Sequence, residues 1–212
     1  MNSAKQNILA RLNRTPLSAK HAFARPAQSP AEPSTEFMTE QFVQALESNH
    51  AEVIITARSA LTQILSALLI EKKISTLLTS ERTRHMLPTA DAPKYSEFPE
   101  SIEIFKQALF NKIDAAITTS QGAIAETGSI ILWPDSVEPR SMSLVPPVHL
   151  VLVEQKSLFP DFQSAIQRQA WSQAMPTNAI LVSGPSKTAD IQQTLAYGAH
   201  GPHALVVLLL TG

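Results

Sequence analysis

The run Leu205-Val-Val-Leu-Leu-Leu210 decides the fold class of this 212-residue sequence. It contains no polar residue, whereas a strand with one face in water alternates apolar and polar residues. Continuous apolar runs are typical of strands in parallel sheets, which are covered on both faces. A second run of this kind lies at 148–153, and shorter β-rich runs lie at 53–56, 75–79, 115–119, 129–133 and 180–183.

Helical patterns separate these runs. Leu61, Ile64, Leu65 and Leu68 share one face at helical spacing. Further helices are predicted around 42–46, at 104–109 and at 158–171. Alternating strands and helices are typical of α/β proteins. We therefore predict an α/β domain over 35–212, with a mostly parallel sheet flanked by helices.

The first 34 residues differ from the rest of the chain. The segment 1–31 contains five basic and no acidic residues, and 32–212 carries a charge of -6. Ile8, Leu9 and Leu12 predict a short amphipathic helix over 4–13, and four prolines predict an extended linker over 14–34. A frayed terminus, a helix that docks on a partner and a transit peptide remain alternatives.

Composition excludes several function classes. A net charge of -1 gives no reason to expect nucleic acid as a partner. The sequence has no cysteine, so it forms no disulfide and holds no cysteine-ligated zinc or iron–sulfur cluster. The longest apolar run, 204–210, is far shorter than the roughly 20 residues of a membrane span. No signal peptide is recognisable, and we expect a cytoplasmic protein.

The glycines fall into three segments beyond residue 121. The first, Thr119-Ser-Gln-Gly-Ala-Ile-Ala-Glu-Thr-Gly-Ser129, has Glu126 as its one carboxylate. Glu126 would act as a general base or accept a hydroxyl from a ligand; the alternative is the cap of a short helix. The loops that follow strands form the ligand crevice of α/β sheets, which favours a functional interpretation.

The second segment, Ser183-Gly-Pro-Ser-Lys-Thr-Ala-Asp190, follows the strand at 180–183. We predict that it opens a helix through Ile191 and Leu195. Free amides at a helix N-terminus beside Lys187 would bind a carboxylate or phosphate. The alternative is a capped helix with solvent at its end, and the glycine spacing is not that of a P-loop.

The third segment, Tyr197-Gly-Ala-His-Gly-Pro-His203, precedes the last strand. His200 would act as an acid–base group near neutral pH. A zinc site that adds His149 and His203 is disfavoured because no familiar ligand spacing is present, so we predict no metal and a satisfied histidine at a strand edge for His149. Arg140 would clamp a ligand carboxylate or form a salt bridge to Asp135 or Glu138.

These segments together resemble the LUD domain of the lactate-utilisation protein C family. The resemblance rests on Gly122-Ala-Ile-Ala-Glu-Thr-Gly-Ser-Ile130, Pro139-Arg-Ser-Met-Ser-Leu-Val-Pro146, Ser183-Gly-Pro-Ser-Lys-Thr-Ala-Asp-Ile191 and Gly198-Ala-His-Gly-Pro202, in the family's order. It implies a fold like that of sugar-phosphate isomerases, CoA-transferases and formyltetrahydrofolate cyclo-ligases (the NagB/RpiA/CoA-transferase-like fold). It also implies two iron–sulfur partner proteins with which the chain oxidises L-lactate to pyruvate.

The sequence departs from the family where Lys187 replaces an arginine, Gln192 an acidic residue and Ala199 a valine. Lysine keeps the charge but loses the fork geometry of arginine. We carry positions over as site candidates without a mechanism. The catalytic candidates are Glu126, Lys187 and His200, and the ligand or anion candidates are Thr127, Gly128, Arg140, Gly184, Ser186, Lys187, Thr188, Asp190, Gly198 and Gly201.

The leading function is therefore the non-redox subunit of a lactate-oxidising system, with iron–sulfur clusters on partner chains and no cofactor on this one. One rival is a stand-alone enzyme on the same fold, such as a phosphosugar isomerase or a cyclo-ligase. Another is a regulatory protein that binds a hydroxy acid. Likeness of fold alone does not choose among them.

Overall fold

This computed structural model describes residues 3–14, 33–90, 92–98, 102–189, 195–198 and 201–212. The chain divides into two units, Met1–Glu32 and Pro33–Gly212. In the first unit, helix α1 spans Ser3–Arg14, which confirms the helix predicted over 4–13. Among the described residues, no helix has the length and apolar character needed to cross a membrane.

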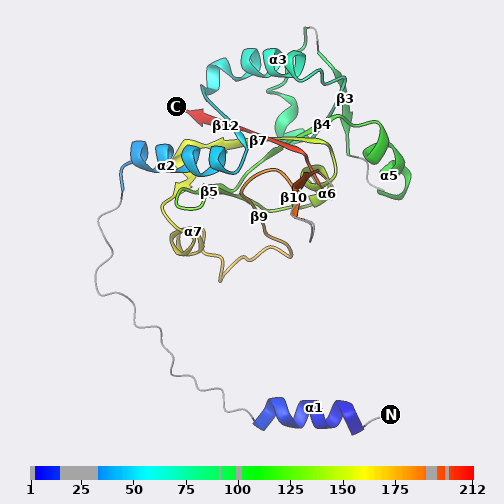
Figure 1. Cartoon of the computed structure of the whole chain (residues 1–212), viewed down its shortest axis with the longest axis vertical. Helices are drawn as coiled ribbons and strands as arrows, with labels where there is room; N and C mark the ends of the chain where they lie inside the picture. Colours follow the sequence, from blue (N-terminus) through cyan, green and yellow to red (C-terminus); the bar gives the residue numbers. More distant parts are fainter. Residues whose placement is uncertain (1–2, 15–32, 91, 99–101, 190–194, 199–200) are drawn as a thin grey trace. The chain divides into compact units, whose positions relative to one another are not determined.

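A six-stranded sheet forms the centre of the second unit (Figure 1). All its neighbouring strands run parallel, in the order β1-β12-β7-β4-β2-β3. The α/β class with a mostly parallel sheet is therefore confirmed. The strands are β1 (Glu52–Ala57), β2 (Thr76–Thr79), β3 (Lys94–Glu97), β4 (Ala115–Thr119), β7 (Val148–Glu154) and β12 (Ala204–Thr211).

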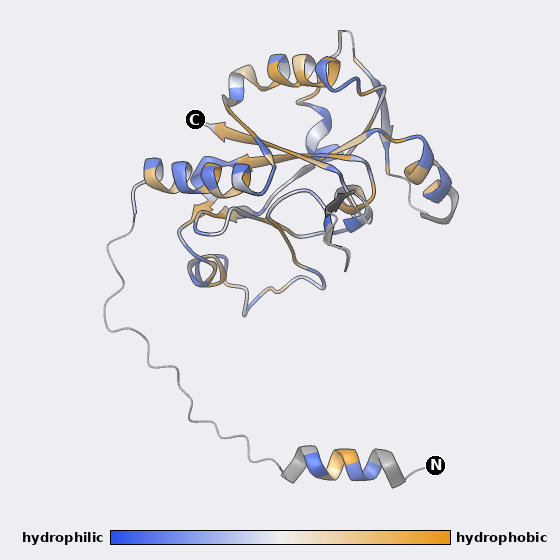
Figure 2. Cartoon of the chain, viewed as in Figure 1, coloured by the Kyte–Doolittle hydropathy of each residue, from blue (hydrophilic) through white to orange (hydrophobic). Residues whose placement is uncertain are grey.

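Both faces of this sheet are covered, as the continuous apolar runs predict. Helix α3 (Leu61–Glu71) packs on one face, against Leu150 and Leu208. Helix α2 (Thr35–Ser48) packs on the other, against Val151 and Val207. Successive residues of a strand point to opposite faces, so one apolar run supplies both cores. Figure 2 shows the hydrophobic central strands between helices that carry both polar and apolar residues.

Shorter elements complete the covering layers. Helix α5 packs against β2 and β4 through Leu109, Leu78 and Ala116. The remaining helices are η1 (Arg58–Ala60), α4 (Glu81–Arg84), α5 (Ile102–Asn111), α6 (Arg140–Leu144), η2 (Gln155–Ser157) and α7 (Phe162–Arg168).

A second sheet with the order β8-β5-β6-β9 supports α2 and the central sheet. Its strands are β5 (Gly122–Ile124), β6 (Ser129–Leu132), β8 (Leu158–Phe159) and β9 (Ile180–Val182). The helix predicted over 158–171 is wrong at both ends. Leu158 and Phe159 pair with β5, and α7 begins only after Asp161, whose carboxylate caps it by accepting from the Ser164 amide.

The helix predicted after Pro185 is also wrong over the described residues; its part at 190–194 lies outside them. Strands β10 (Lys187–Ala189) and β11 (Leu195–Tyr197) pair antiparallel instead. The Ser186 amide donates to the Pro202 carbonyl, and the Ser186 carbonyl accepts from the Gly198 amide. These tertiary bonds hold the backbone extended at the point where a helix would need its first turn. The argument for an anion site at a helix N-terminus therefore does not apply here.

The direction of chain progression reverses between β2 and β4. From β2 the chain continues to β3 on one side, and from β4 it continues to β7 and β12 on the other. In open α/β sheets, ligands bind outside the carboxyl ends of the strands at such a reversal. The fold thus selects the ends of β2 and β4 as the place to look for a site.

Candidate functional site

One buried carboxylate, that of Glu138, joins the ends of β2 and β4. Its Oε1 accepts from the Ser80 hydroxyl, which follows β2, at 2.7 Å. Its Oε2 accepts from the Thr119 amide at 3.0 Å and from the Thr119 hydroxyl at 2.7 Å, at the end of β4. The residue is 7% exposed, so these donors replace water around the carboxylate.

Arg82 adds positive charge to this cluster. Its Nη1 lies 3.8 Å from Glu138 Oε2, and its Nη2 pairs with Asp135. The bond to Asp135 raises the pKa of Arg82 above its usual value, although burial acts in the opposite direction. Burial acts to raise the pKa of Asp135, but the bonds from Arg82 and the Glu138 and Val137 amides outweigh it and lower that pKa.

The Asp135–Glu138 turn is held by hydrogen bonds between its own residues. Asp135 Oδ1 accepts from the amides of Val137 and Glu138, both at 2.9 Å. The Asp135 amide donates to the Glu138 carbonyl at 3.3 Å. The turn therefore presents the Glu138 side chain to the strand ends as a preformed unit.

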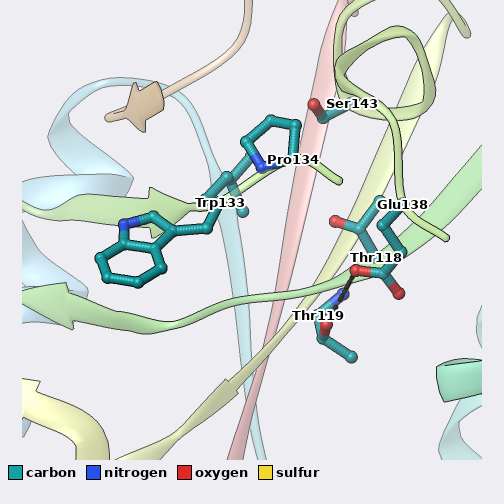
Figure 3. Close-up of a pocket in the computed structure, with 7 residues that line it drawn as sticks. Thr118, Thr119, Trp133, Pro134, Glu138 and Ser143 are labelled. Carbon is teal, nitrogen blue, oxygen red and sulfur yellow. Dashed lines mark hydrogen bonds between the residues drawn. The ribbon is translucent and has the colours of Figure 1, made fainter. Parts of the chain in front are cut away.

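A small cleft lies beside this carboxylate (Figure 3). It measures about 10 Å³, which is room for one water molecule. Ser120 directly follows the lining residue Thr119, and Ser141 lies two residues before the lining residue Ser143. The hydroxyls of both are buried without a hydrogen-bond partner in the described structure. The cleft is lined by Thr118, Thr119, Leu132, Trp133, Pro134, Glu138 and Ser143.

A hydroxyl–imidazole pair lies behind the cleft wall. Thr118 Oγ1 is 2.8 Å from His149 Nε2, and both residues are buried. Burial lowers the pKa of His149 to about 4, so the imidazole is neutral at physiological pH. The prediction of a satisfied histidine is confirmed, although His149 lies in β7 inside the sheet rather than at an edge.

The LUD domain family model matches residues 39–210 of this chain. The chain belongs to the LUD-domain family. The match confirms the resemblance that the four glycine- and proline-containing segments suggest.

Several relatives of this LUD protein are known. An uncharacterized protein of Neisseria meningitidis serogroup B is 35% identical, over 98% of this chain and 94% of its own length. Lactate utilization protein C of Macrococcus caseolyticus is 34% identical, over 49% of this chain and 44% of its own length. Lactate utilization protein C 1 of Bacillus mycoides is 29% identical, with coverage of 76% and 74%.

A crystal structure of a DUF162-family protein from Deinococcus radiodurans superposes with a TM-score of 0.64. The alignment covers 84% of this chain and 99% of that protein, at 19% sequence identity. At this identity the likeness supports the fold of the LUD domain alone.

In this LUD domain, most of the predicted site residues that the structure describes form two groups, and Glu126 and Arg140 lie apart from them. In the first group, the Thr127 hydroxyl bonds to that of Ser129, which bonds to that of Ser183, each at 2.7 Å. Gly128 and Gly184 pack against the end of α2, because a Cβ at either would lie within 3 Å of Ala45 or Asn49. These glycines therefore serve close packing of the turns on α2.

Glu126 lies in the turn of the β5–β6 hairpin, so the interpretation as a cap of a short helix is wrong. Its amide donates to the Pro160 carbonyl and its side chain is exposed. To act as a general base in a water-excluded site, Glu126 would therefore need a ligand or a partner protein to cover its side chain.

The second group surrounds Ser186. A Cβ added at Gly201 would lie 3.1 Å from the Ser186 side chain and 3.4 Å from the carbonyl oxygen of Leu144, at the end of α6. Gly201 therefore packs closely against both residues. Lys187 is exposed at the start of β10. Asp190 and His200 lie outside the described residues, as does the side chain of Thr188. Ligand binding by the two groups stays a prediction.

Arg140 begins α6 with an exposed side chain. The salt bridge considered for it is wrong, because in the described structure Asp135 and Glu138 pair with Arg82. None of the predicted site residues that the structure describes lines the cleft at the switch point. The described part of the chain has no group of three or more histidine and acidic side chains placed to hold a metal ion.

Sequence reasoning missed Glu138 as a site residue. Glu138 directly precedes the segment 139–146 that carries the family resemblance, but the sequence offered it only as a salt-bridge partner of Arg140. Its donors come from Ser80 and Thr119, which are 58 and 19 residues away. Only the strand order brings these groups together.

Proposed function

We propose that this LUD protein takes part in lactate utilisation, as the non-redox component of a cytoplasmic system that oxidises L-lactate to pyruvate. The observation that carries the proposal is the family itself. Several relatives named lactate utilization protein C align over three quarters of the chain or more, for example over 77% for the protein of Oceanobacillus iheyensis.

The family resemblance implies that two partner proteins carry the electrons, and the amino-acid composition of this chain agrees with that division. Oxidation of lactate to pyruvate removes two electrons, and a chain without cysteine cannot hold a cysteine-ligated iron–sulfur cluster to carry them. We place such clusters on two partner proteins. This chain would supply the polar residues at the switch point, next to the cleft beside Glu138, to position a small ligand.

Genetics and purification together test this proposal. A strain lacking the gene is expected to lose growth on L-lactate and to keep growth on pyruvate, and a plasmid copy should restore it. A tagged copy should co-purify two cysteine-rich iron–sulfur proteins from lactate-grown cells. Normal growth of the deletion strain on L-lactate would refute the proposed role.

A biochemical control separates this role from a stand-alone dehydrogenase. The purified chain is expected to give no lactate-dependent reduction of an artificial electron acceptor, and activity should appear when the partner proteins are added. Rapid dye reduction by the pure chain would contradict the assignment of electron transfer to the partners.

A further inference from the structure

The groups around Glu138 form a binding set for a carboxylate. Two hydroxyls, one backbone amide and a nearby guanidinium converge on its two oxygens, from Ser80, Thr119 and Arg82. Each is a donor or a cation, and charge-assisted bonds of this kind are the strong ones in recognition of carboxylates. We propose that these groups form a binding site for a ligand carboxylate. In the ligand-free protein the Glu138 carboxylate occupies this site, and the ligand carboxylate displaces it.

Position supports a ligand site rather than a purely structural tie. The donors come from the ends of β2 and β4, the two strands that flank the switch point. A cleft continues from the carboxylate, lined by the apolar residues Leu132 and Pro134 and by Thr118 and Ser143. The hydroxyls of these last two residues bond to His149 and to the Arg140 carbonyl. With Glu138 in place this cleft has room for one water, so a ligand enters only when the carboxylate leaves.

Displacement of Glu138 is a local event. The Asp135–Glu138 turn is held by bonds that Asp135 makes within the turn, so it stays folded when the Glu138 side chain moves away. Asp135 keeps its own pairing with Arg82. The wild-type protein thus has a closed form occupied by Glu138 and an open form that binds the ligand, and its apparent affinity is reduced by the population of the closed form.

The site selects a short monocarboxylate. One carboxylate satisfies the donors, and the apolar wall accepts a one- or two-carbon tail. The choice of L-lactate as the first probe rests on the proposed function, whereas the carboxylate site itself rests on the geometry.

The decisive experiment compares two substitutions at one position. Glu138→Ala empties the carboxylate position, whereas Glu138→Gln keeps it filled with a side chain of the same size. We would measure binding of L-lactate, propionate and acetate by calorimetry and thermal shift, with acetamide and sodium chloride as controls. Glu138→Ala should bind the carboxylates at least about tenfold more tightly than wild type, and Glu138→Gln should show no gain.

A second substitution locates the bound ligand. Thr119→Val removes one donor at constant size, so the double variant Glu138→Ala/Thr119→Val should lose about tenfold in carboxylate affinity relative to Glu138→Ala. Carboxylate binding that ignores Thr119→Val, or that is equal in wild type and Glu138→Ala, would overturn the proposal. So would equal binding of acetamide and acetate.

Two further outcomes are informative. If Glu138→Ala does not fold alone, refolding from urea should succeed with acetate and fail with acetamide; failure with both would refute the site. Growth on L-lactate is scored separately. A deletion strain that grows normally, combined with tight acetate binding by Glu138→Ala, would remove the proposed function and leave the carboxylate site standing.

Discussion

His149 should make the stability of the protein fall steeply in mild acid. The imidazole is buried in β7 and bonded to the Thr118 hydroxyl at 2.8 Å. Burial disfavours the charged form and lowers the pKa of His149 from 6.5 to about 4. The His149 imidazole is therefore protonated near pH 6.5 in the unfolded chain, but only near pH 4 in the folded chain.

The sign and size of the effect follow by linkage. A depressed pKa in the folded state contributes stability that is complete above pH 6.5 and is lost as the pH falls toward 4. The difference between the two pKa values corresponds to about 3 kcal/mol of unfolding free energy, and about 2 kcal/mol of it is lost by pH 5. Protonation of His149 alone would thus remove a large part of the unfolding free energy of a typical domain.

Urea unfolding at pH 7.5 and pH 5 measures this loss. A variant at position 149 shares every other ionisable group with wild type, so the matched control is His149→Gln, which keeps a polar side chain near Thr118 and cannot be protonated in this pH range. Wild type should lose about 2 kcal/mol more than this variant between the two pH values. Equal losses in the two proteins, or an imidazole that is protonated at pH 5 in the folded state by NMR, would refute the reasoning.

Other predictions concern the domain boundary, a strained turn and the anion candidates. Ser34 caps α2 by accepting from an amide in its first turn, so Ser34→Ala should cost about 1 kcal/mol in urea unfolding, whereas deletion of residues 1–32 should leave the melting temperature nearly unchanged. Gly128→Ala should destabilise by about 1–2 kcal/mol, since φ is +62° and the new Cβ would lie 2.9 Å from that of Ala45; unchanged stability would mean that the turn can move off α2. Lys187 is exposed, so Lys187→Ala should leave stability within about 0.5 kcal/mol, and weaker binding of phosphate or lactate in that variant would support the predicted anion site.

Much of the fold could be predicted because the relevant signals are local. The apolar runs at 148–153 and 205–210 correspond to β7 and β12, and the helical face of Leu61, Leu65 and Leu68 corresponds to the buried face of α3. In each case hydrophobic periodicity reports burial directly, and burial on both faces identifies a central parallel strand.

The errors arise where tertiary hydrogen bonds override local preference. Ser186 has the sequence context of a helix cap, but its amide and carbonyl are bound to Pro202 and Gly198, and an extended hairpin follows. Leu158 and Phe159 fit a helical pattern, yet they pair with β5 and complete the edge of the second sheet. In both segments the deciding partner is distant in sequence and has no local signature.

The contrast between Glu126 and Glu138 explains why the candidate site was missed. Glu126 lies in a glycine-containing segment of the kind that often forms a ligand site. Gly128, however, is needed because the turn packs closely against Ala45 of α2, and the Glu126 side chain is exposed. Glu138 ends the Asp135–Glu138 turn, which contains no glycine, but it is buried among donors at the ends of two strands. A local pattern reports what the backbone needs locally. Where donors converge depends on the order of the strands, and that order is set by which apolar faces pack together across the whole domain.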